Sequence, residues 1–205
     1  MTIELLYNTP LWVASKAIRK CWASEDKSDT CNTNDNIGTK DRELIERVGN
    51  KNKHASTLEH LNYSFDIDGI SRACLQELAR HRHASMSVKS TRYTLKELKN
   101  TNNLMSFQVM TGNDYIDVRS TEQLSSVRQL LQEGYSNDQV KYSLPESFKT
   151  SLVWTINARS LQNFLSLRTN KAALWEIREL AYQLYNRLPE EHKYLFFDSL
   201  YQEEK

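Results

Sequence analysis

The sequence predicts a fold of the α/β or α+β class, with a central β-sheet flanked by long helices. Segments with the two-residue period of strands alternate along the chain with segments of helical period, and the longest helical patterns lie in the second half. The 205 residues are 39% hydrophobic, with ten Tyr, six Phe and four Trp, which is enough to bury one sizeable core. We therefore expect a single domain over residues 1–205.

The N-terminal part of the chain predicts a strand and then helices. Residues 2–7 favour a short strand, and the apolar residues over 11–21 recur at helical spacing. Residues 24–38 are rich in Ser, Asp, Asn and Thr without periodicity, so we expect a loop there. A charged helix over 40–48 is then expected to end at Gly49.

The middle of the chain predicts a strand, a helix and an extended segment. Apolar and polar residues alternate over 61–67, which is the pattern of a half-buried strand. From Ile70 the apolar residues follow one helical face, and this helix is expected to end near Arg80. The extended segment that follows would project Ser90 and Arg92 to the same side.

The last part of the chain predicts one strand and two helices. Residues 101–134 have the weakest pattern, apart from a helical stretch over 124–131, so we place any variable insertion there. The β-branched and aromatic residues over 148–156 predict a strand, and helices are expected from Ala158 and over 171–188.

The composition argues against several classes of protein. The net charge is only +1, so general attraction to nucleic acid or to an anionic membrane is not expected. No run approaches the ~20 apolar residues of a membrane-spanning helix. The cysteines Cys21, Cys31 and Cys74 form no Cys-x-x-Cys pair and leave an odd thiol, which favours a reducing compartment, so we expect a cytoplasmic protein.

The positive charge is concentrated between Arg72 and Lys99, where seven Lys or Arg residues outnumber two Glu residues. At its centre lies the run Arg-His-Arg-His-Ala-Ser-Met-Ser-Val-Lys-Ser-Thr-Arg, from Arg80 to Arg92. Guanidinium groups suit phosphate and carboxylate oxygens, and Ser and His side chains add directional hydrogen bonds. This segment therefore predicts a binding site for a phosphorylated ligand.

A second informative segment runs from Asn157 to Arg168. On a helix, Arg159, Asn163 and Leu167 form one stripe that could contact the polar edge of a ring. Arg168 lies nine residues after Arg159, about half a turn away at 100° per residue, so the two arginines would face different ligands or subunits.

A third segment, from His54 to His60, is ambiguous by itself. Its spacing does not match a helical zinc motif, and no further Cys or His cluster follows, so we expect no metal site. Ser56 and Glu59 also have the spacing of a helix capping box, which is the structural alternative.

Together the three segments resemble the flavin-dependent thymidylate synthases, a family that methylates dUMP without a cysteine nucleophile. Each segment matches a family motif, and the motifs occur in the family's order. The matched residues are His54, Ser56, Glu59 and His60; Arg80, His81, Arg82, Ser85, Ser90 and Arg92; and Asn157, Arg159, Ser160, Asn163, Phe164 and Arg168. The Trp-Glu-Ile-Arg run that often follows is present from Trp175 to Arg178.

The resemblance implies a homotetramer with FAD at subunit interfaces and dUMP stacked on the flavin. Methylenetetrahydrofolate and NADPH would be the other substrates, and Arg168 would be the catalytic arginine that favours ionisation of the uracil N3 position. The implied flavin contacts are His54, Ser56, Glu59, Arg80, His81, Arg82, Asn157, Arg159 and Asn163. The implied dUMP contacts are Glu77, Arg80, Lys89, Ser90, Thr91, Arg92, Lys141 and Arg168.

Physical reasoning agrees with these implied roles. The five glycines never lie closer than eleven residues apart, so no Gly-x-Gly-x-x-Gly turn exists and side chains such as Arg80 and Arg82 must hold a pyrophosphate. Ser90 and Arg92 offer a hydroxyl donor and a fixed cation for the dUMP phosphate. An always-protonated Arg168 could stabilise negative charge that develops on the uracil ring.

The chain departs from the family pattern at three positions. Ser87 replaces the common Asn, Val88 stands where an acidic or amide residue is frequent, and Lys141 stands where Arg is frequent. These departures keep open a flavoenzyme that acts on another pyrimidine nucleotide. The competing class is a nucleic-acid-binding module, in which the basic segment would bind the backbone and Tyr93 would stack on a base.

Overall fold

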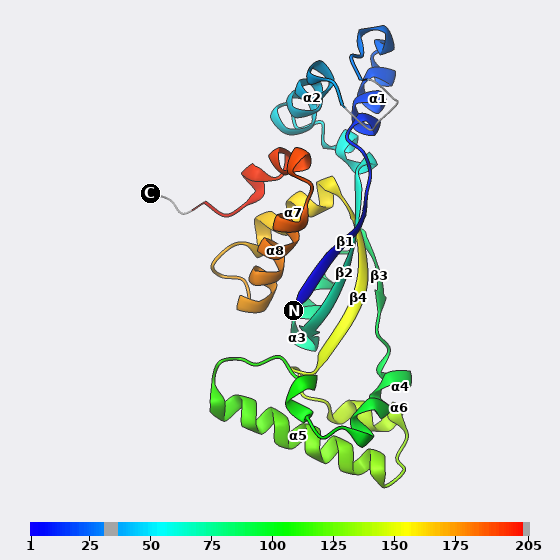
Figure 1. The fold of residues 1–205 in the computed structure, drawn as a ribbon. Coiled ribbons are helices and arrows are strands. Elements are labelled where there is room, and N and C mark those ends of the chain that lie inside the picture. Colours follow the sequence, from blue (N-terminus) through cyan, green and yellow to red (C-terminus); the bar gives the residue numbers. More distant parts are fainter. Residues whose placement is uncertain (31–36, 203–205) are drawn as a thin grey trace. The chain divides into compact units, whose positions relative to one another are not determined.

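The fold, seen in a computed structural model that describes residues 1–30 and 37–202, contains a four-stranded β-sheet and helices of several lengths. The strand order is β1-β2-β4-β3, so the two longest strands are neighbours in the centre although they are far apart in the sequence (Figure 1). The strands are β1 (Thr2–Asn8), β2 (Asn62–Ser71), β3 (Ala84–Val88) and β4 (Lys149–Asn157). This architecture confirms the predicted fold class.

The contacts divide the chain into two compact units. The first unit comprises Met1–Thr2, Ile67–Arg80 and Ser87–Val153. The second unit comprises Ile3–Asp66, His81–Met86 and the chain from Trp154 onward. All four strands contribute residues to both units, β1 through Thr2 in the first unit and Ile3–Asn8 in the second.

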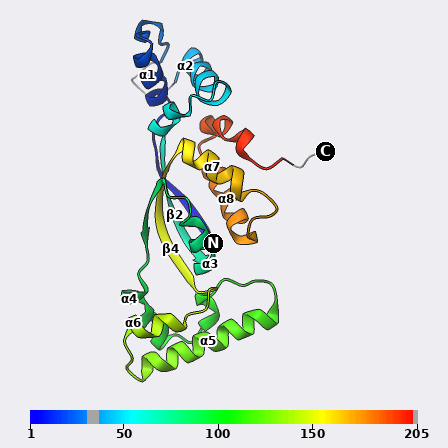
Figure 2. The same ribbon diagram turned by 180° about the vertical axis from the view of Figure 1, so that it is seen from behind.

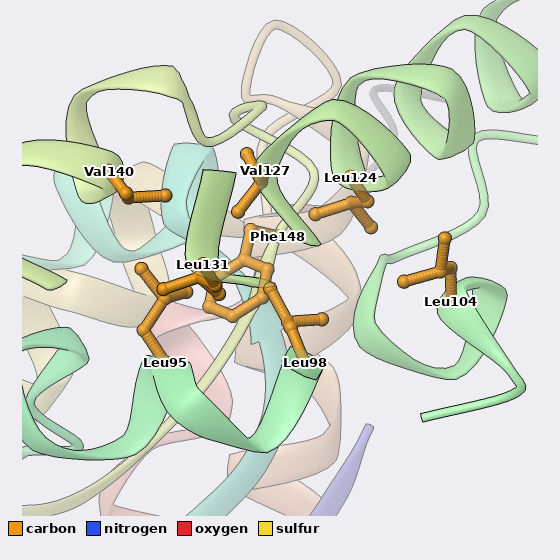
Figure 3. Packing of buried hydrophobic residues seen from close by; sticks show 8 residues of the cluster. All are labelled: Leu95, Leu98, Leu104, Leu124, Val127, Leu131, Val140 and Phe148. Atoms are coloured by element: carbon orange, nitrogen blue, oxygen red, sulfur yellow. The ribbon is translucent and has the colours of Figure 1, made fainter. Parts of the chain in front are cut away.

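The first unit has a hydrophobic core beneath its longest helix. Its helices are α3 (Arg72–Leu78), α4 (Thr91–Thr94), α5 (Asp114–Gln132) and α6 (Asn137–Val140). Figure 3 shows side chains from α5, α6, β4's N-terminal flank and the turn after α4 converging on one cluster. The cluster consists of Leu95, Leu98, Leu104, Leu124, Val127, Leu131, Val140 and Phe148. Helix α5 is therefore part of this core.

The second unit buries the larger aromatic side chains. Its helices are α1 (Trp12–Cys21), α2 (Thr39–Ile45), α7 (Ala158–Arg168) and α8 (Trp175–Arg187). Helices α7 and α8 lie side by side in Figure 1 and in Figure 2. Helix α7 packs on the sheet through Phe164, whose ring centroid lies 5.1 Å from that of Trp154 on β4. Strand β2 adds Tyr63 and Phe65, both fully buried, as the predicted alternation requires.

The helix expected to close at Gly49 has a different ending. Helix α2 ends at Ile45 and continues as a π-helix over Glu46–Lys51 that contains Gly49. A Cβ atom at Gly49 would lie 2.8 Å from Cδ2 of Leu58, so a close approach explains this glycine rather than a helix cap. The prediction that Gly49 ends the helix was wrong. The position needs a glycine because Leu58 packs so close that a side chain would not fit.

The helix expected from Ile70 begins later. Ile70 is buried in β2, and Ser71 caps α3 by accepting a hydrogen bond from the Cys74 backbone N–H at 2.9 Å. The helix expected over 171–188 likewise begins at Trp175. Both differences concern the ends of elements. An apolar residue at such a position fits the two-residue period of a strand as well as the helical period, so the sequence does not locate the boundary.

The segment from Ser90 to Arg92 is not extended as predicted. Ser90 has extended backbone angles and occupies the N-cap position of α4, whereas Arg92 lies inside that helix. The two side chains therefore do not share one face of a strand. The Ser90 side chain makes no capping hydrogen bond, and the Thr94 hydroxyl donates to the Ser90 backbone carbonyl at 3.0 Å.

Two further expectations concern the N-terminal half and membranes. Part of the predicted loop over 24–38 forms a 3₁₀ turn at Glu25–Lys27, while residues 31–36, including Cys31, lie outside the described residues. Cys21 and Cys74 are free thiols. Within 1–30 and 37–202, no helix combines the length and the hydropathy that crossing a membrane would require.

Candidate active site

The site residues that the motifs suggest are divided between the two units. Almost all of the expected flavin contacts lie in the second unit, and almost all of the expected nucleotide contacts lie in the first. The second unit holds His54, Ser56, Glu59, His81, Arg82, Asn157, Arg159, Asn163 and Arg168. The first unit holds Glu77, Arg80, Lys89, Ser90, Thr91, Arg92 and Lys141.

Within the second unit, a hydrogen bond joins two of the motifs. Arg168 is the last residue of α7, and its Nε donates to Nε2 of His81 at 2.9 Å. A guanidinium group can only donate, so Nε2 of His81 must carry the lone pair and the proton must lie on Nδ1. The ring of Phe164 packs edge-to-face against His81, with the centroids 4.8 Å apart. The imidazole and the arginine that it contacts are thus held in defined orientations.

A second pair joins the segment from His54 to His60 to the same α7 segment. Arg159, in the first turn of α7, donates from Nη1 to Oε1 of Glu59 at 2.6 Å. Both side chains are about half exposed, so the pair contributes little to folding stability. Helix α7 runs from Ala158 through Arg168, which places Arg159 and Arg168 half a turn apart, and they contact different side chains.

The remaining polar residues of this unit include one that has a structural role. Oδ1 of Asn157 accepts from the Ser160 backbone N–H at 2.9 Å and so caps α7. His54, Ser56 and Asn163 are exposed.

The segment from His54 to His60 does not form the capping box that its sequence allowed. The turn Ala55–His60 has no side-chain cap, so the capping-box interpretation of Ser56 and Glu59 was wrong, and Glu59 pairs with Arg159 instead. In the described part of the chain, no group of three His, Cys, Asp or Glu side chains could hold a metal ion.

In the first unit, the cations of the basic segment are paired with acids from outside the motifs. Nε of Arg92 donates to Oδ1 of Asp138 on α6 at 2.9 Å. Nζ of Lys89 donates to Oε2 of Glu97 at 2.8 Å. Lys141 follows α6 directly, and its ammonium lies 5.5 Å from the ring centroid of Tyr142.

An open cavity of about 400 Å³ adjoins this cation-rich segment. Lys89 and Thr91 line it together with Lys149, and Phe148 provides apolar surface. The cavity lies wholly in the first unit. Lys89 and Thr91 therefore border a space that could admit part of a ligand.

Comparison with known proteins places these features in a family. The family model described as "Thymidylate synthase complementing protein" matches residues 4–192. A flavin-dependent thymidylate synthase of Campylobacter jejuni is 57% identical over 211 aligned residues, which cover 99% of each chain. The enzyme of that name from Wolinella succinogenes is 57% identical over 204 residues, covering 96% of this chain and 97% of its own.

The chain belongs to the flavin-dependent thymidylate synthase family. A crystal structure of thymidylate synthase X from Helicobacter pylori with FAD and dUMP matches the fold with a TM-score of 0.91. It is 48% identical in sequence, and the match covers 98% of this chain and 100% of that one. The resemblance drawn from the three motifs is confirmed, and family membership argues against the nucleic-acid-binding module.

The motifs of the flavin-dependent thymidylate synthase family did not reveal every residue that contacts the site side chains. Asp138, Asn137 and Glu97 contact Arg92 or Lys89, and they lie outside all three motifs. Their types and spacing are ordinary for exposed helices, so the sequence carried no signal for them. Only the fold brings α6 beside α4.

Proposed function

We propose that this chain catalyses the reductive methylation of dUMP to dTMP with FAD as cofactor. Methylenetetrahydrofolate would supply the carbon and NADPH the hydride. Relatives of matching length carry the name of this activity, and the related H. pylori structure contains FAD and dUMP. The observation that carries the proposal is the Arg168–His81 hydrogen bond, because it joins a proposed uracil-activating side chain to a proposed flavin contact.

The second unit offers side chains that fit FAD. The chain has no glycine-rich dinucleotide turn, so cations and amides must hold the pyrophosphate and the ring system. Arg82, Arg159, His54 and Asn163 present such groups on exposed surface. Bound FAD would supply the redox chemistry, carrying a hydride equivalent from NADPH to the pyrimidine.

The first unit offers side chains that fit the nucleotide phosphate. The guanidinium of Arg92 and the hydroxyl of Ser90 would bind phosphate oxygens, and Lys141 would add a single point charge without the bidentate fork of arginine. Ser90 has no base as a partner among the described residues. Its hydroxyl therefore serves binding in this proposal, rather than acting as a nucleophile.

Arg168 would act on the pyrimidine itself. A permanently charged guanidinium favours the N3-ionised form of the ring and so raises electron density at C5, the carbon that receives the one-carbon unit. The hydrogen bond to His81 would keep Arg168 oriented before the substrate arrives, which avoids reorganisation during the reaction. Phe164 limits the rotation of His81 and supports this geometry.

The assembly and location of the enzyme belong to the same proposal. A homotetramer with FAD at its interfaces would explain why the proposed flavin contacts are largely exposed in one copy of the chain. Free Cys21 and Cys74 suit a reducing compartment such as the cytoplasm.

The visible spectrum of the purified protein tests the proposal, followed by addition of NADPH without oxygen, with and without dUMP. We expect a flavin band that bleaches faster when dUMP is present, and dTMP once methylenetetrahydrofolate is added. A colourless protein that takes up no added FAD would contradict the proposal.

A further inference from the structure

The motif cation Arg92 is held in place by α6, a helix that belongs to no motif. Nε of Arg92 donates to Oδ1 of Asp138 at 2.9 Å. Nδ2 of the neighbouring Asn137 donates to the backbone carbonyl of Arg92 at 2.7 Å. Two consecutive residues of α6 thus fix both the main chain and the side chain of one arginine.

The contact with Asp138 occupies only one side of the guanidinium group. In the described part of the chain, Arg92 makes no other side-chain hydrogen bond or ion pair, and its remaining contact is with the Tyr93 ring at 6.0 Å. The Nη1 and Nη2 groups therefore form an open fork. A planar fork of two N–H groups matches two oxygens of one phosphate.

Both short helices are attached to the same hydrophobic core. Val140, the last residue of α6, is buried in the cluster of Figure 3. Leu95 and Leu98, which directly follow α4, are buried in the same cluster. This shared core fixes the distance between α4 and α6, so the contact with Arg92 does not depend on two mobile loops.

We propose that Asp138 and Asn137 are positioning residues that orient the Nη fork of Arg92 toward the nucleotide phosphate. The proposal rests on the proposed function, in which Arg92 binds that phosphate. Asp138 carries a negative charge near the phosphate, so its benefit must come from orientation and not from attraction. This distinction gives the proposal a sharp test.

The test measures dUMP binding to the FAD-loaded enzyme, by the change in flavin absorbance, together with kcat and KM for dTMP formation. Asp138→Ala removes the acceptor, and we expect it to raise the Kd and KM for dUMP roughly two- to fivefold, the size of an exposed charge contact, with kcat nearly unchanged. Asp138→Asn keeps an acceptor oxygen and should lose less. Asn137→Ala should also raise the KM for dUMP, because it removes the hydrogen bond to the Arg92 backbone.

A matched control is available on α5. Arg119 and Glu122 form an ion pair of 2.8 Å whose side chains are as exposed as those of Arg92 and Asp138. Glu122→Ala therefore removes a comparable carboxylate from the same unit, and we expect it to leave dUMP binding unchanged. Deoxyuridine, which lacks the phosphate, is the matched ligand, and Asp138→Ala should not weaken its binding.

Two outcomes would overturn the proposal. Tighter dUMP binding by Asp138→Ala would mean that Asp138 competes with the phosphate for Arg92. Equal losses for dUMP and deoxyuridine would mean a general structural effect. Failure of the wild-type enzyme to form dTMP would instead contradict the proposed function, so the two failures are distinguishable.

Discussion

The two units of the molecule hold their proposed functional side chains in different ways. In the second unit, two contacts have both members in the motifs, namely Glu59–Arg159 and His81–Arg168. In the first unit, the basic segment supplies only the cation, and the acid that contacts it comes from elsewhere, as in Arg92–Asp138. The motifs therefore supply both sides of these two contacts in the second unit, whereas the contacts in the first unit depend on residues that only the fold brings close.

The largest effect should come from replacing Arg168, whose contact with His81 joins two motifs. We expect Arg168→Ala to lower kcat by roughly 10²–10³, because the proposed mechanism uses this preorganised charge to stabilise the reacting ring. FAD retention should remain normal, since flavin contacts other than His81 do not involve this side chain. The measurements are the rate of dTMP formation and the flavin absorbance after gel filtration.

Arg187, the last residue of α8, provides the matched control for Arg168. It is an exposed arginine at a helix C-terminus, so Arg187→Ala reproduces the loss of a cation at that position. We expect wild-type turnover from this variant. Wild-type turnover from Arg168→Ala would show that the ionisation role is wrong.

A second prediction tests whether the nucleotide side depends on the core of the first unit. Leu124 on α5 is fully buried in the cluster that also anchors α4 and α6. Leu124→Ala should lower the free energy of unfolding by about 3 kcal/mol, the usual cost of such a cavity. Because the core positions Arg92, dUMP binding should weaken more than FAD binding, as measured by urea unfolding and by two titrations.

Leu184→Ala is the reciprocal variant in the second unit. Leu184 lies on α8 and is also fully buried. It should cost a similar unfolding free energy but weaken FAD binding more than dUMP binding. If each variant weakened FAD binding and dUMP binding equally, the assignment of FAD to the second unit and of the dUMP phosphate to the first would be contradicted.

These contacts mark how much the sequence could predict. Alternation over 61–67 predicted β2, and the joint occurrence of three motifs predicted the family. The fold brings the motif residues His81 and Arg168 into contact, while their roles stay predictions. Gly49 and Ile70 were misjudged because close packing against Leu58 and burial within β2 leave no local signature. Asp138 was missed because its role arises only where two helices far apart in sequence meet.

A pH-dependent prediction concerns a buried polar pair in the second unit. The Tyr63 hydroxyl lies 2.7 Å from Nδ1 of His192, and both side chains are buried. Burial, with the nearby charge of Arg42, lowers the pKa of His192 to about 4 from its usual 6.5, while burial raises the pKa of Tyr63. Tyr63 therefore donates and neutral His192 accepts.

The sign of the pH effect follows from this lowered pKa. The unfolded chain binds a proton at His192 near pH 6.5 and the folded chain only near pH 4, so this stabilisation is complete above about pH 6.5 and is lost as the pH falls toward 4. The loss amounts to about 3 kcal/mol. His192→Asn keeps an acceptor for Tyr63 without titrating, so its unfolding free energy should fall less between pH 7 and 4. Parallel curves for the two proteins would contradict the prediction.

The smallest effect should come from the exposed pair of the second unit. Glu59→Gln removes the charge that contacts Arg159 but leaves an oxygen acceptor, and exposed pairs contribute roughly 0.2–1 kcal/mol. Unfolding free energy should therefore hardly change. If both residues contact FAD directly, flavin retention should fall for Glu59→Gln and fall further for Arg159→Ala, which a fluorescence titration with FAD would measure. Unchanged flavin affinity in both variants would mean that Glu59 and Arg159 form only a surface ion pair. The contact between His81 and Arg168 would then be the remaining functional contact between motifs in the described part of the second unit.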